Sequence, residues 1–173
     1  LIKYNFKKVV VGCRDSNPLV AGKGIEKLIK SGIEVIEGVL EDECKELNKR
    51  FFTFHEKKRP YIILKWAQTN DGYLDKLREK GEVGSNWISA PETKALVHKW
   101  RSEEQSILVG RNTIINDNLS LTVREYKGEN PIRIVIDSQL QISSDVNIYS
   151  EEAPTIVFNR LKNELKENIE WVK

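Results

Sequence analysis

Short runs of β-branched residues that alternate with helical segments constrain the fold of this chain more than any other feature. Lys8–Gly12 and Glu34–Gly38 are apolar runs that end on glycine, so both are predicted strands. Residues 24–31 between them carry apolar side chains at helical spacing, and Gly32 stands where a residue after a helix takes positive φ. Because a compact βαβ unit favours parallel strands, the sequence predicts that these two strands pair in parallel.

The second half of the chain is strand-rich. Four apolar runs there predict strands at residues 106–110, 132–136, 155–158 and 169–172, and a helix is expected directly after Gly110. Alternating strands and helices indicate an α/β architecture, and continuously apolar strands favour a sheet that is covered on both faces. Ligands on such sheets bind at the carboxyl ends of strands. The segments after the strands, including 110–117, are therefore the first candidates for a site.

A helix is predicted between these halves, with a boundary after it. Apolar residues step by four, three, four and three positions over Leu40–Phe54, which predicts one helix with one face toward a core. Pro60 disfavours helical geometry at the preceding residue, so the helix must end before it. We expect a new strand at Tyr61–Trp66, a turn at Asp71–Gly72 and an exposed loop over residues 75–86.

A further helix is expected after this loop. Ser89–Glu92 has the pattern of a capping box with proline in the first turn, in which the Ser hydroxyl and Glu carboxylate satisfy backbone N–H groups. Leu96, Val97 and Trp100 are its predicted buried side.

Composition narrows the class of protein. The 173 residues allow one ordinary domain or two small ones, and the net charge of +2 gives no long-range attraction to nucleic acid or membrane. No apolar run approaches the roughly 18 residues of a membrane span. Cys13 and Cys44 are expected to be small buried residues of a cytoplasmic protein, and no ligand spacing predicts a metal site. Because the chain lacks methionine and begins at Leu1, we expect an internal piece of a longer polypeptide.

Several residues have both a chemical and an ordinary structural interpretation. Gly110–Thr113 joins a strand to a helix start and fits a phosphate cradle, although many such turns bind nothing. Lys65 is charged within a predicted apolar strand, which suits an anion or a wet cleft, or a lysine whose ammonium reaches solvent at a sheet edge. Arg101 and Arg124 suit an anionic substrate, but surface arginines are commoner. Trp87 suits stacking on a heterocycle or anchoring of its loop.

The order and spacing of several motifs decide among these interpretations. Together they resemble the bifunctional deaminase/reductase of riboflavin biosynthesis over nearly the whole chain. The blocks that carry the resemblance are Pro60–Ala67, Asn70–Gly72, Ser85–Ser89, Val97–Arg101, Ile107–Gly110, Asn112–Thr113, Leu121–Arg124 and Pro131–Ser138, with Asp15–Ile25 and Gly32–Glu41 before them.

The resemblance implies two incomplete domains. Residues 1–57 would be the end of a cytidine-deaminase-like domain, and residues 58–173 the first part of a reductase domain like dihydrofolate reductase, so the chain is incomplete at both ends. Zinc would bind only in the missing part of the deaminase domain, because the family's His-x-Glu and Pro-Cys-x-x-Cys motifs are absent here. The family's late glycine-rich cofactor segment would likewise lie beyond Lys173. We expect a cytoplasmic homo-oligomer.

The resemblance also assigns roles by matching position. NADPH would reduce the ribosyl group of a phosphorylated ribosylaminopyrimidine, 5-amino-6-(5-phosphoribosylamino)uracil, to a ribityl chain. Lys65 and Asp117 are the implied catalytic residues. The implied cofactor residues are Ala67, Trp87, Thr113, Asp117 and Ser138, and the implied substrate residues are Ser85, Arg101, Leu121 and Arg124.

Two departures from the family pattern leave an alternative open. The chain has Asp117-Asn118-Leu119 where the family usually has Asp-Asp-Pro, and Asn70-Asp71-Gly72 where Leu-Asp-Gly is usual. The first Asp is retained, which favours a working reductase. The alternative is a non-catalytic nucleotide-binding or assembly domain with the same fold.

Overall fold

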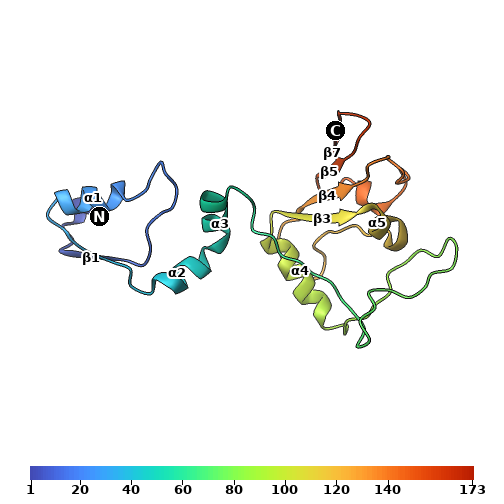
Figure 1. Ribbon diagram of the computed structural model, residues 1–173, viewed down its shortest axis with the longest axis horizontal. Coiled ribbons are helices and arrows are strands. Elements are labelled where there is room, and N and C mark those ends of the chain that lie inside the picture. Colours follow the sequence, from blue (N-terminus) through green and yellow to red (C-terminus); the bar gives the residue numbers. More distant parts are fainter. The chain divides into compact units, whose positions relative to one another are not determined.

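The chain divides into two compact units. The computed structural model describes all 173 residues and separates Leu1–Lys65 from Trp66–Lys173 (Figure 1). The predicted domain boundary after residue 57 stays a prediction. Each unit is described here by itself.

The first unit contains the predicted βαβ arrangement. It begins with a short 3-10 helix, η1 (Ile2–Tyr4), followed by β1 (Lys8–Val11), α1 (Lys23–Lys30) and β2 (Glu34–Glu37). β1 and β2 pair in parallel, with Val9 opposite Val35, so this prediction is confirmed. Gly32 has a φ of 77°, as expected for the residue that ends the helix region.

The single helix predicted over residues 40–54 is wrong, because the structure has two. α2 (Glu41–Leu47) and α3 (Lys49–Lys57) are separated at Asn48, whose φ is −106° and ψ is 23°. The Asn48 side-chain amide donates to the Cys44 carbonyl at 2.9 Å, a local bond with which asparagine competes against helix continuation. The predicted face is not buried either. Leu47 is 82% exposed, whereas Phe52 is buried.

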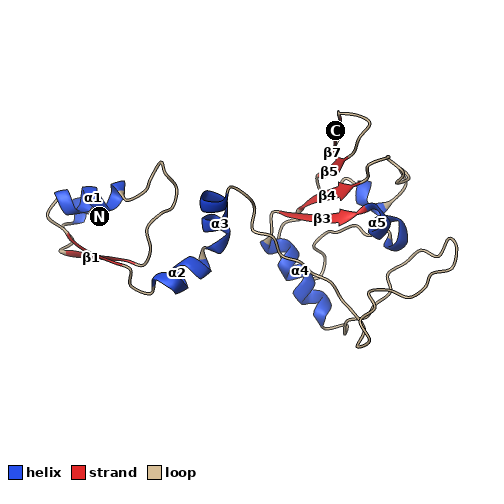
Figure 2. Ribbon diagram, viewed as in Figure 1, coloured by secondary structure: helices blue, strands red, loops and turns tan.

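The chain is irregular between α3 and the next helix. Lys58 ends α3 in the left-handed conformation, so the predicted stop before Pro60 is confirmed. The strand predicted at Tyr61–Trp66 is absent, because no neighbouring strand pairs with it and its apolar side chains are mostly exposed (Figure 2). Lys65 therefore does not lie in a strand. The turn at Asp71–Gly72 is confirmed, since the Gly72 N–H donates to the Thr69 carbonyl at 2.9 Å.

A five-stranded sheet organises the second unit. The strands lie in the order β3-β4-β5-β7-β6, in which neighbours are parallel except for the antiparallel pair β6 and β7. The four strands predicted for this half are confirmed, whereas β6 was not predicted. The elements are α4 (Thr93–Glu103), β3 (Ser106–Gly110), α5 (Arg111–Asp117), β4 (Ile132–Ile136), η2 (Asn147–Tyr149), β5 (Thr155–Phe158), β6 (Glu164–Lys166) and β7 (Ile169–Val172).

The start and the buried side of α4 differ from the prediction. The helix begins at Thr93 without the predicted capping box, and no side chain caps its first turn. The Thr93 hydroxyl instead donates to the Ala90 carbonyl at 2.6 Å. Leu96 and Trp100 are 43% and 46% exposed, and the buried residue of the helix is His98. A polar residue therefore forms the main inward contact of α4.

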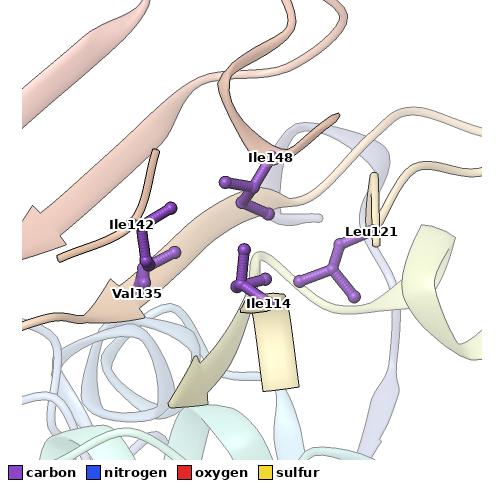
Figure 3. Close-up of a cluster of buried hydrophobic side chains, with 5 residues drawn as sticks. All are labelled: Ile114, Leu121, Val135, Ile142 and Ile148. Atoms are coloured by element: carbon purple, nitrogen blue, oxygen red, sulfur yellow. The ribbon is translucent and has the colours of Figure 1, made fainter. Parts of the chain in front are cut away.

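The core of the second unit lies on one face of the sheet. Five buried side chains from α5, β4 and the connecting segments meet there, as Figure 3 shows. They are Ile114, Leu121, Val135, Ile142 and Ile148. On the opposite face Leu108, Ile136 and Phe158 are each more than 40% exposed. The expectation that both faces are covered is therefore wrong for this unit.

The cysteines are less buried than predicted. Cys13 and Cys44 are free thiols and both are partly exposed. A Cβ at Gly12 would meet the Cys44 Sγ at 2.2 Å, so a glycine is required for this close approach. No helix combines the length and apolarity that crossing a bilayer requires.

Candidate active site

An open depression lies where β3 and β4 end. It has a volume of about 340 Å³, and its wall is formed by the start of α5 and the residues after β4. Thr113 and Ser138, two of the residues implied for the cofactor, both line it. The remaining lining residues are Gly110, Arg111, Asn112 and Ile136. The location agrees with the rule that ligands of α/β sheets bind at the carboxyl ends of the strands.

The chemistry of this wall suits a phosphate-bearing ligand. A Cβ placed on Gly110 would meet nothing within 4 Å, so the backbone there is open to a ligand. Arg111 is the charged side chain of the wall, and its partners are neutral: Asn112 Oδ1 at 3.3 Å and Gln141 Oε1. Its charge is therefore not neutralised by a carboxylate. Two hydroxyl groups, one guanidinium and accessible backbone match the donors that a pyrophosphate needs.

Asp117 lies one helical turn beyond Thr113 and is not part of the wall. Its Oδ1 is 2.7 Å from Arg78 Nη2, and its side chain is 25% exposed. Asn118, one of the departures from the family pattern, has a left-handed φ of 47°. It holds a nearby segment of the same chain in place. Its side-chain oxygen accepts from the Asn147 N–H at 2.8 Å. Asn118 therefore has a structural role in docking the segment around η2.

The other residues implied for cofactor and catalysis are not gathered at the depression. Ala67 is half-buried and Trp87 is 63% exposed, and neither lines the wall. The Lys94 ammonium lies 4.4 Å from the centre of the Trp87 ring, a cation–π contact that holds the loop. Lys65 belongs to the first unit, where it is exposed and has no ion-pair partner. The catalytic role implied for Lys65 stays a prediction.

Two of the four implied substrate residues, Arg101 and Arg124, meet at Thr122 beside α4. Arg101 Nη1 donates to the Thr122 carbonyl at 3.0 Å, and Arg124 Nη1 donates to the Thr122 hydroxyl at 3.4 Å. Leu121, directly before Thr122, is buried. Ser85 is exposed and does not take part in these contacts. Burial lowers the pKa of Arg101 and the charge of Arg124 lowers it further, and no carboxylate opposes these effects. Two adjacent cations without an anion form a receptive site for a phosphate group.

His98 contacts this arginine pair through the backbone of Arg124. Its Nδ1 accepts the Arg124 backbone N–H at 3.0 Å, which requires an unprotonated Nδ1. Burial lowers the pKa of His98, and the charges of Arg101 and Arg124 act in the same direction. Glu125 and a hydrogen bond with the Thr122 backbone oppose them. The histidine is therefore kept neutral.

Sequence reasoning missed three residues of this region as individual participants. Arg111 was part of the recognised cradle, but nothing in the sequence showed that it lacks an acidic partner. His98 stands within the Val97–Arg101 motif, but the predicted buried side of its helix did not include it. Arg78 lies in a loop without any pattern, and no sequence signal identifies it.

Comparison with known proteins agrees with the resemblance. The Riboflavin biosynthesis protein RibD of Aquifex aeolicus is 45% identical over 171 residues, covering 98% of this chain and 47% of that protein. The protein of the same name from Actinobacillus pleuropneumoniae is 40% identical over 148 residues, covering 86% of this chain and 38% of that protein. The chain thus spans about half the length of the relatives it matches, or less.

Solved structures give the same result. The crystal structure of a diaminohydroxyphosphoribosylaminopyrimidine deaminase/5-amino-6-(5-phosphoribosylamino)uracil reductase from Thermotoga maritima is 38% identical with a TM-score of 0.82, covering 98% of this chain and 48% of that one. Acinetobacter baumannii RibD, form 1, is 31% identical with a TM-score of 0.77, covering 93% of this chain and 46% of that one. Residues 60–173 match the family described as the RibD C-terminal domain. The chain therefore belongs to the RibD C-terminal domain family.

Proposed function

We propose that residues 58–173 form part of an NADPH-dependent reductase of riboflavin biosynthesis. The substrate is 5-amino-6-(5-phosphoribosylamino)uracil, whose ribosyl group is reduced to ribityl. Residues 1–57 are the end of a deaminase domain whose zinc site lies outside this chain. The observation that carries the proposal is the open depression at the ends of β3 and β4, with Thr113 and Ser138 on its wall.

The residues of this depression fit NADPH. The Thr113 and Ser138 hydroxyls, the open backbone at Gly110 and the unneutralised Arg111 supply donors for its phosphate groups. When bound, NADPH supplies a hydride to C1 of the sugar. Trp87 offers a flat apolar ring on which the cofactor can stack, and Ala67 is a further proposed cofactor residue.

The arginine pair beside α4 fits the phosphate of the substrate. Arg101 and Arg124 carry two adjacent charges that no carboxylate neutralises, so a phosphate dianion is the group they bind most strongly. The phosphate is remote from the reacting carbon. Its binding energy therefore serves to orient the sugar, with Ser85 and Leu121 completing the substrate site.

Lys65 and Asp117 are the proposed catalytic residues. Reduction at C1 opens the sugar ring, so the ring oxygen O4 must take a proton while C1 is polarised for the hydride. Lys65 Nζ and the Asp117 carboxyl group are the proposed groups for these two tasks.

The experiment that tests the function follows NADPH oxidation by the full-length protein with the phosphorylated pyrimidine substrate. Lys65→Ala and Asp117→Asn should each lower turnover by orders of magnitude. Lys80→Ala and Glu129→Gln are matched controls, because both residues are exposed and neither forms an ion pair, and they should keep normal turnover. Normal turnover in Lys65→Ala and Asp117→Asn would refute the assignments. Binding of NADPH without substrate-dependent oxidation would instead favour the non-catalytic alternative.

A cytoplasmic homo-oligomer stays part of the proposal. Sedimentation of the full-length protein tests the assembly, and a single monomeric species would refute it.

A further inference from the structure

We infer that Arg78 is a positioning residue of the proposed reductase site. It fastens the loop that carries Ser85 and Trp87 to the end of α5 that carries Asp117. This inference rests on the proposed function for its consequence in catalysis, and on the contacts of Arg78 for the fastening itself.

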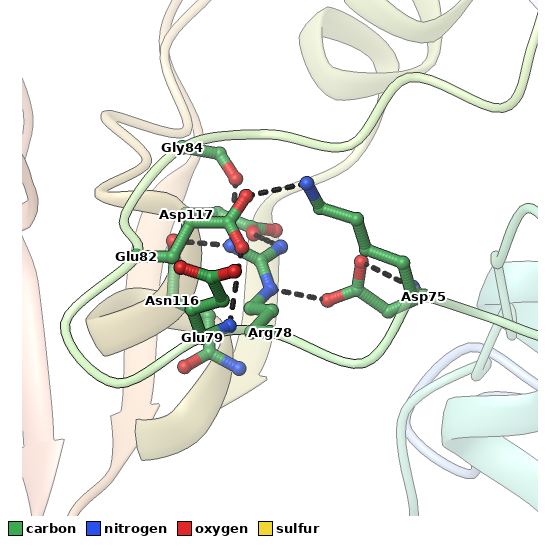
Figure 4. Close-up of polar contacts among 8 residues, drawn as sticks. Asp75, Arg78, Glu79, Glu82, Gly84, Asn116 and Asp117 are labelled. Carbon is green, nitrogen blue, oxygen red and sulfur yellow. Dashed lines mark hydrogen bonds and ion pairs between the residues drawn. The ribbon is translucent and has the colours of Figure 1, made fainter.

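The contacts of Arg78 converge from both sides of the loop. Its Nη2 lies 2.7 Å from Asp117 Oδ1, and its Nη1 donates to the Asn116 carbonyl at 2.9 Å. The same Nη1 donates to the Gly84 carbonyl at 2.8 Å, and its Nε donates to Asp75 Oδ2 at 2.5 Å. One guanidinium thus joins the beginning of the loop, its end and the last turn of α5, as Figure 4 shows.

A backbone bond completes the attachment. The Gly84 N–H donates to the Asn116 carbonyl at 2.7 Å, so this carbonyl accepts from the loop twice. Ser85 follows directly and Trp87 lies two residues later, so the position of both depends on where Gly84 is held. Loops that carry ligand-binding residues need such an anchor, because their own backbone makes few regular hydrogen bonds.

Arg78 is not itself a site for an anionic ligand. Its side chain is 12% exposed, and two carboxylates, Asp75 and Asp117, already neutralise its charge. The pairing raises the pKa of Arg78, with Asp75 as the main cause. This distinguishes it from Arg101 and Arg111, which lack a carboxylate partner. Its fork of five donors matches the several acceptors around it, which a lysine ammonium cannot do.

The loop also contains a contact that serves as a control. Lys76 Nζ and Glu82 Oε1 form an ion pair at 2.5 Å within the loop. Glu82→Gln removes this ion pair while its side-chain oxygen can still accept the Glu79 N–H. It therefore removes a loop contact while leaving every partner of the Arg78 hydrogen bonds in place.

Limited proteolysis of the full-length protein tests the attachment without any ligand. A lysine-specific endoprotease cleaves after Lys76 and Lys80, which flank Arg78 in the loop, and leaves the bond after Arg78 intact. We expect Arg78→Gln to raise the rate of cleavage at these lysines at least about tenfold, and Glu82→Gln to raise it less than about twofold. Equal cleavage rates in Arg78→Gln and the wild-type protein would overturn the inference, whatever the activity of the protein.

Steady-state kinetics then test positioning against a merely structural role. Damage to folding lowers the number of active molecules and so lowers apparent kcat at unchanged KM. Displacement of Ser85 and Trp87 instead raises KM for substrate and NADPH, roughly tenfold to 100-fold. We expect this rise in Arg78→Gln, a partial recovery in Arg78→Lys and none of it in Glu82→Gln. A fall in kcat alone at unchanged KM would overturn the positioning role. If the wild-type protein oxidises no NADPH, the proposed function is refuted. Faster cleavage of Arg78→Gln in that same protein would still support the role of Arg78 in attaching the loop.

Discussion

Replacing Arg133 tests whether a buried arginine holds the second unit together. Its side chain is fully buried, and its guanidinium bonds to neutral acceptors throughout. Nε donates to Thr155 Oγ1 at 2.9 Å, and Nη1 donates to Ser150 Oγ at 3.1 Å and the Ser120 carbonyl at 3.3 Å. Nη2 donates to the Ser150 and Ala153 carbonyls. One side chain thereby fixes the segments on both sides of η2 against the sheet.

The loss of stability expected for Arg133→Met depends on which acceptors of the Arg133 guanidinium also have a second donor. The Asn168 side chain also donates to the Ser150 and Ala153 carbonyls, at 2.8 and 2.7 Å, so these two stay satisfied in Arg133→Met. The Ser120 carbonyl and the Ser150 and Thr155 hydroxyls lose a donor, at about 1–3 kcal/mol for each group left unsatisfied. The two hydroxyls keep their own bonds to Glu152 and to the Ile148 carbonyl, so their share is the smaller one. Removal of a buried charge offsets part of this loss. We expect Arg133→Met to lower the free energy of opening by about 2–4 kcal/mol.

Arg133→Lys should be no milder than Arg133→Met. The lysine keeps the buried charge, but its compact ammonium cannot reach acceptors that are spread around a planar fork. The charge is then buried with fewer partners, which is the costly arrangement. A substitution that preserves charge is thus expected to destabilise the sheet as much as one that removes it.

Hydrogen exchange of the β4 and β5 amides in the full-length protein measures this free energy locally, without requiring two-state unfolding of the whole molecule. A change of about 2–4 kcal/mol accelerates exchange roughly 30- to 700-fold. Arg160→Met is the control, because Arg160 is exposed. Exchange in Arg133→Met within threefold of the wild type, or wild-type exchange in Arg133→Lys, would refute the reasoning.

Three further predictions concern the site. Burial lowers the pKa of His98 below its ordinary 6.5, so the unfolded chain binds a proton before the folded protein does, and stability is lost as the pH falls below about 6.5. His98→Asn keeps a hydrogen-bond acceptor, so the melting temperature of this variant should depend less on pH between 7 and 5. An unchanged dependence would contradict this prediction. Arg101→Gln and Arg124→Gln should each raise KM for the phosphorylated substrate roughly 10- to 100-fold. A substrate analogue without phosphate is the control, and its KM should be the same in the variants as in the wild type. Thr113→Val and Ser138→Ala should each weaken NADPH binding roughly fivefold in a fluorescence titration, and unchanged affinity in both would exclude the depression as the cofactor site.

The strands of this fold were predictable because their signal is local. Runs such as Val9–Val11 and Ile107–Val109 are apolar and each is followed by glycine, so both the strands and the parallel pairing of β1 with β2 follow from the sequence. The segment Tyr61–Trp66 has the same composition but no neighbouring strand with which to pair. Strand formation requires a partner, and a partner is not a local property.

The helices show a second limit of sequence reasoning. The apolar spacing over residues 40–54 is regular, but Asn48 bonds to the Cys44 carbonyl and divides the helix there. In α4 the inward position belongs to His98, because the Arg124 backbone N–H offers it a partner. Such a partner comes from a distant part of the chain, so hydrophobic periodicity does not predict it.

The candidate site was predictable only in part, for the same reason. Gly110 and Thr113 follow from the rule about strand ends, and the motifs around Arg101 and Arg124 identify the arginine pair. Whether an arginine is free for a ligand depends on which carboxylates lie near it in space. Nothing in the sequence shows that Arg78 has two carboxylate partners and that Arg111 has none.

The two edge strands of the five-stranded sheet differ in how readily they can pair with a strand from another molecule. At one edge β6 is short and carries Glu164 and Lys166, charged side chains that discourage a further strand. At the other edge β3 presents Ser106–Gly110 without a single charge, and Leu108 is 58% exposed there. A partly folded chain can therefore add a strand at β3 far more readily than at β6. Aggregation during synthesis or refolding is expected to start at β3, and a charge placed at Leu108 would suppress it.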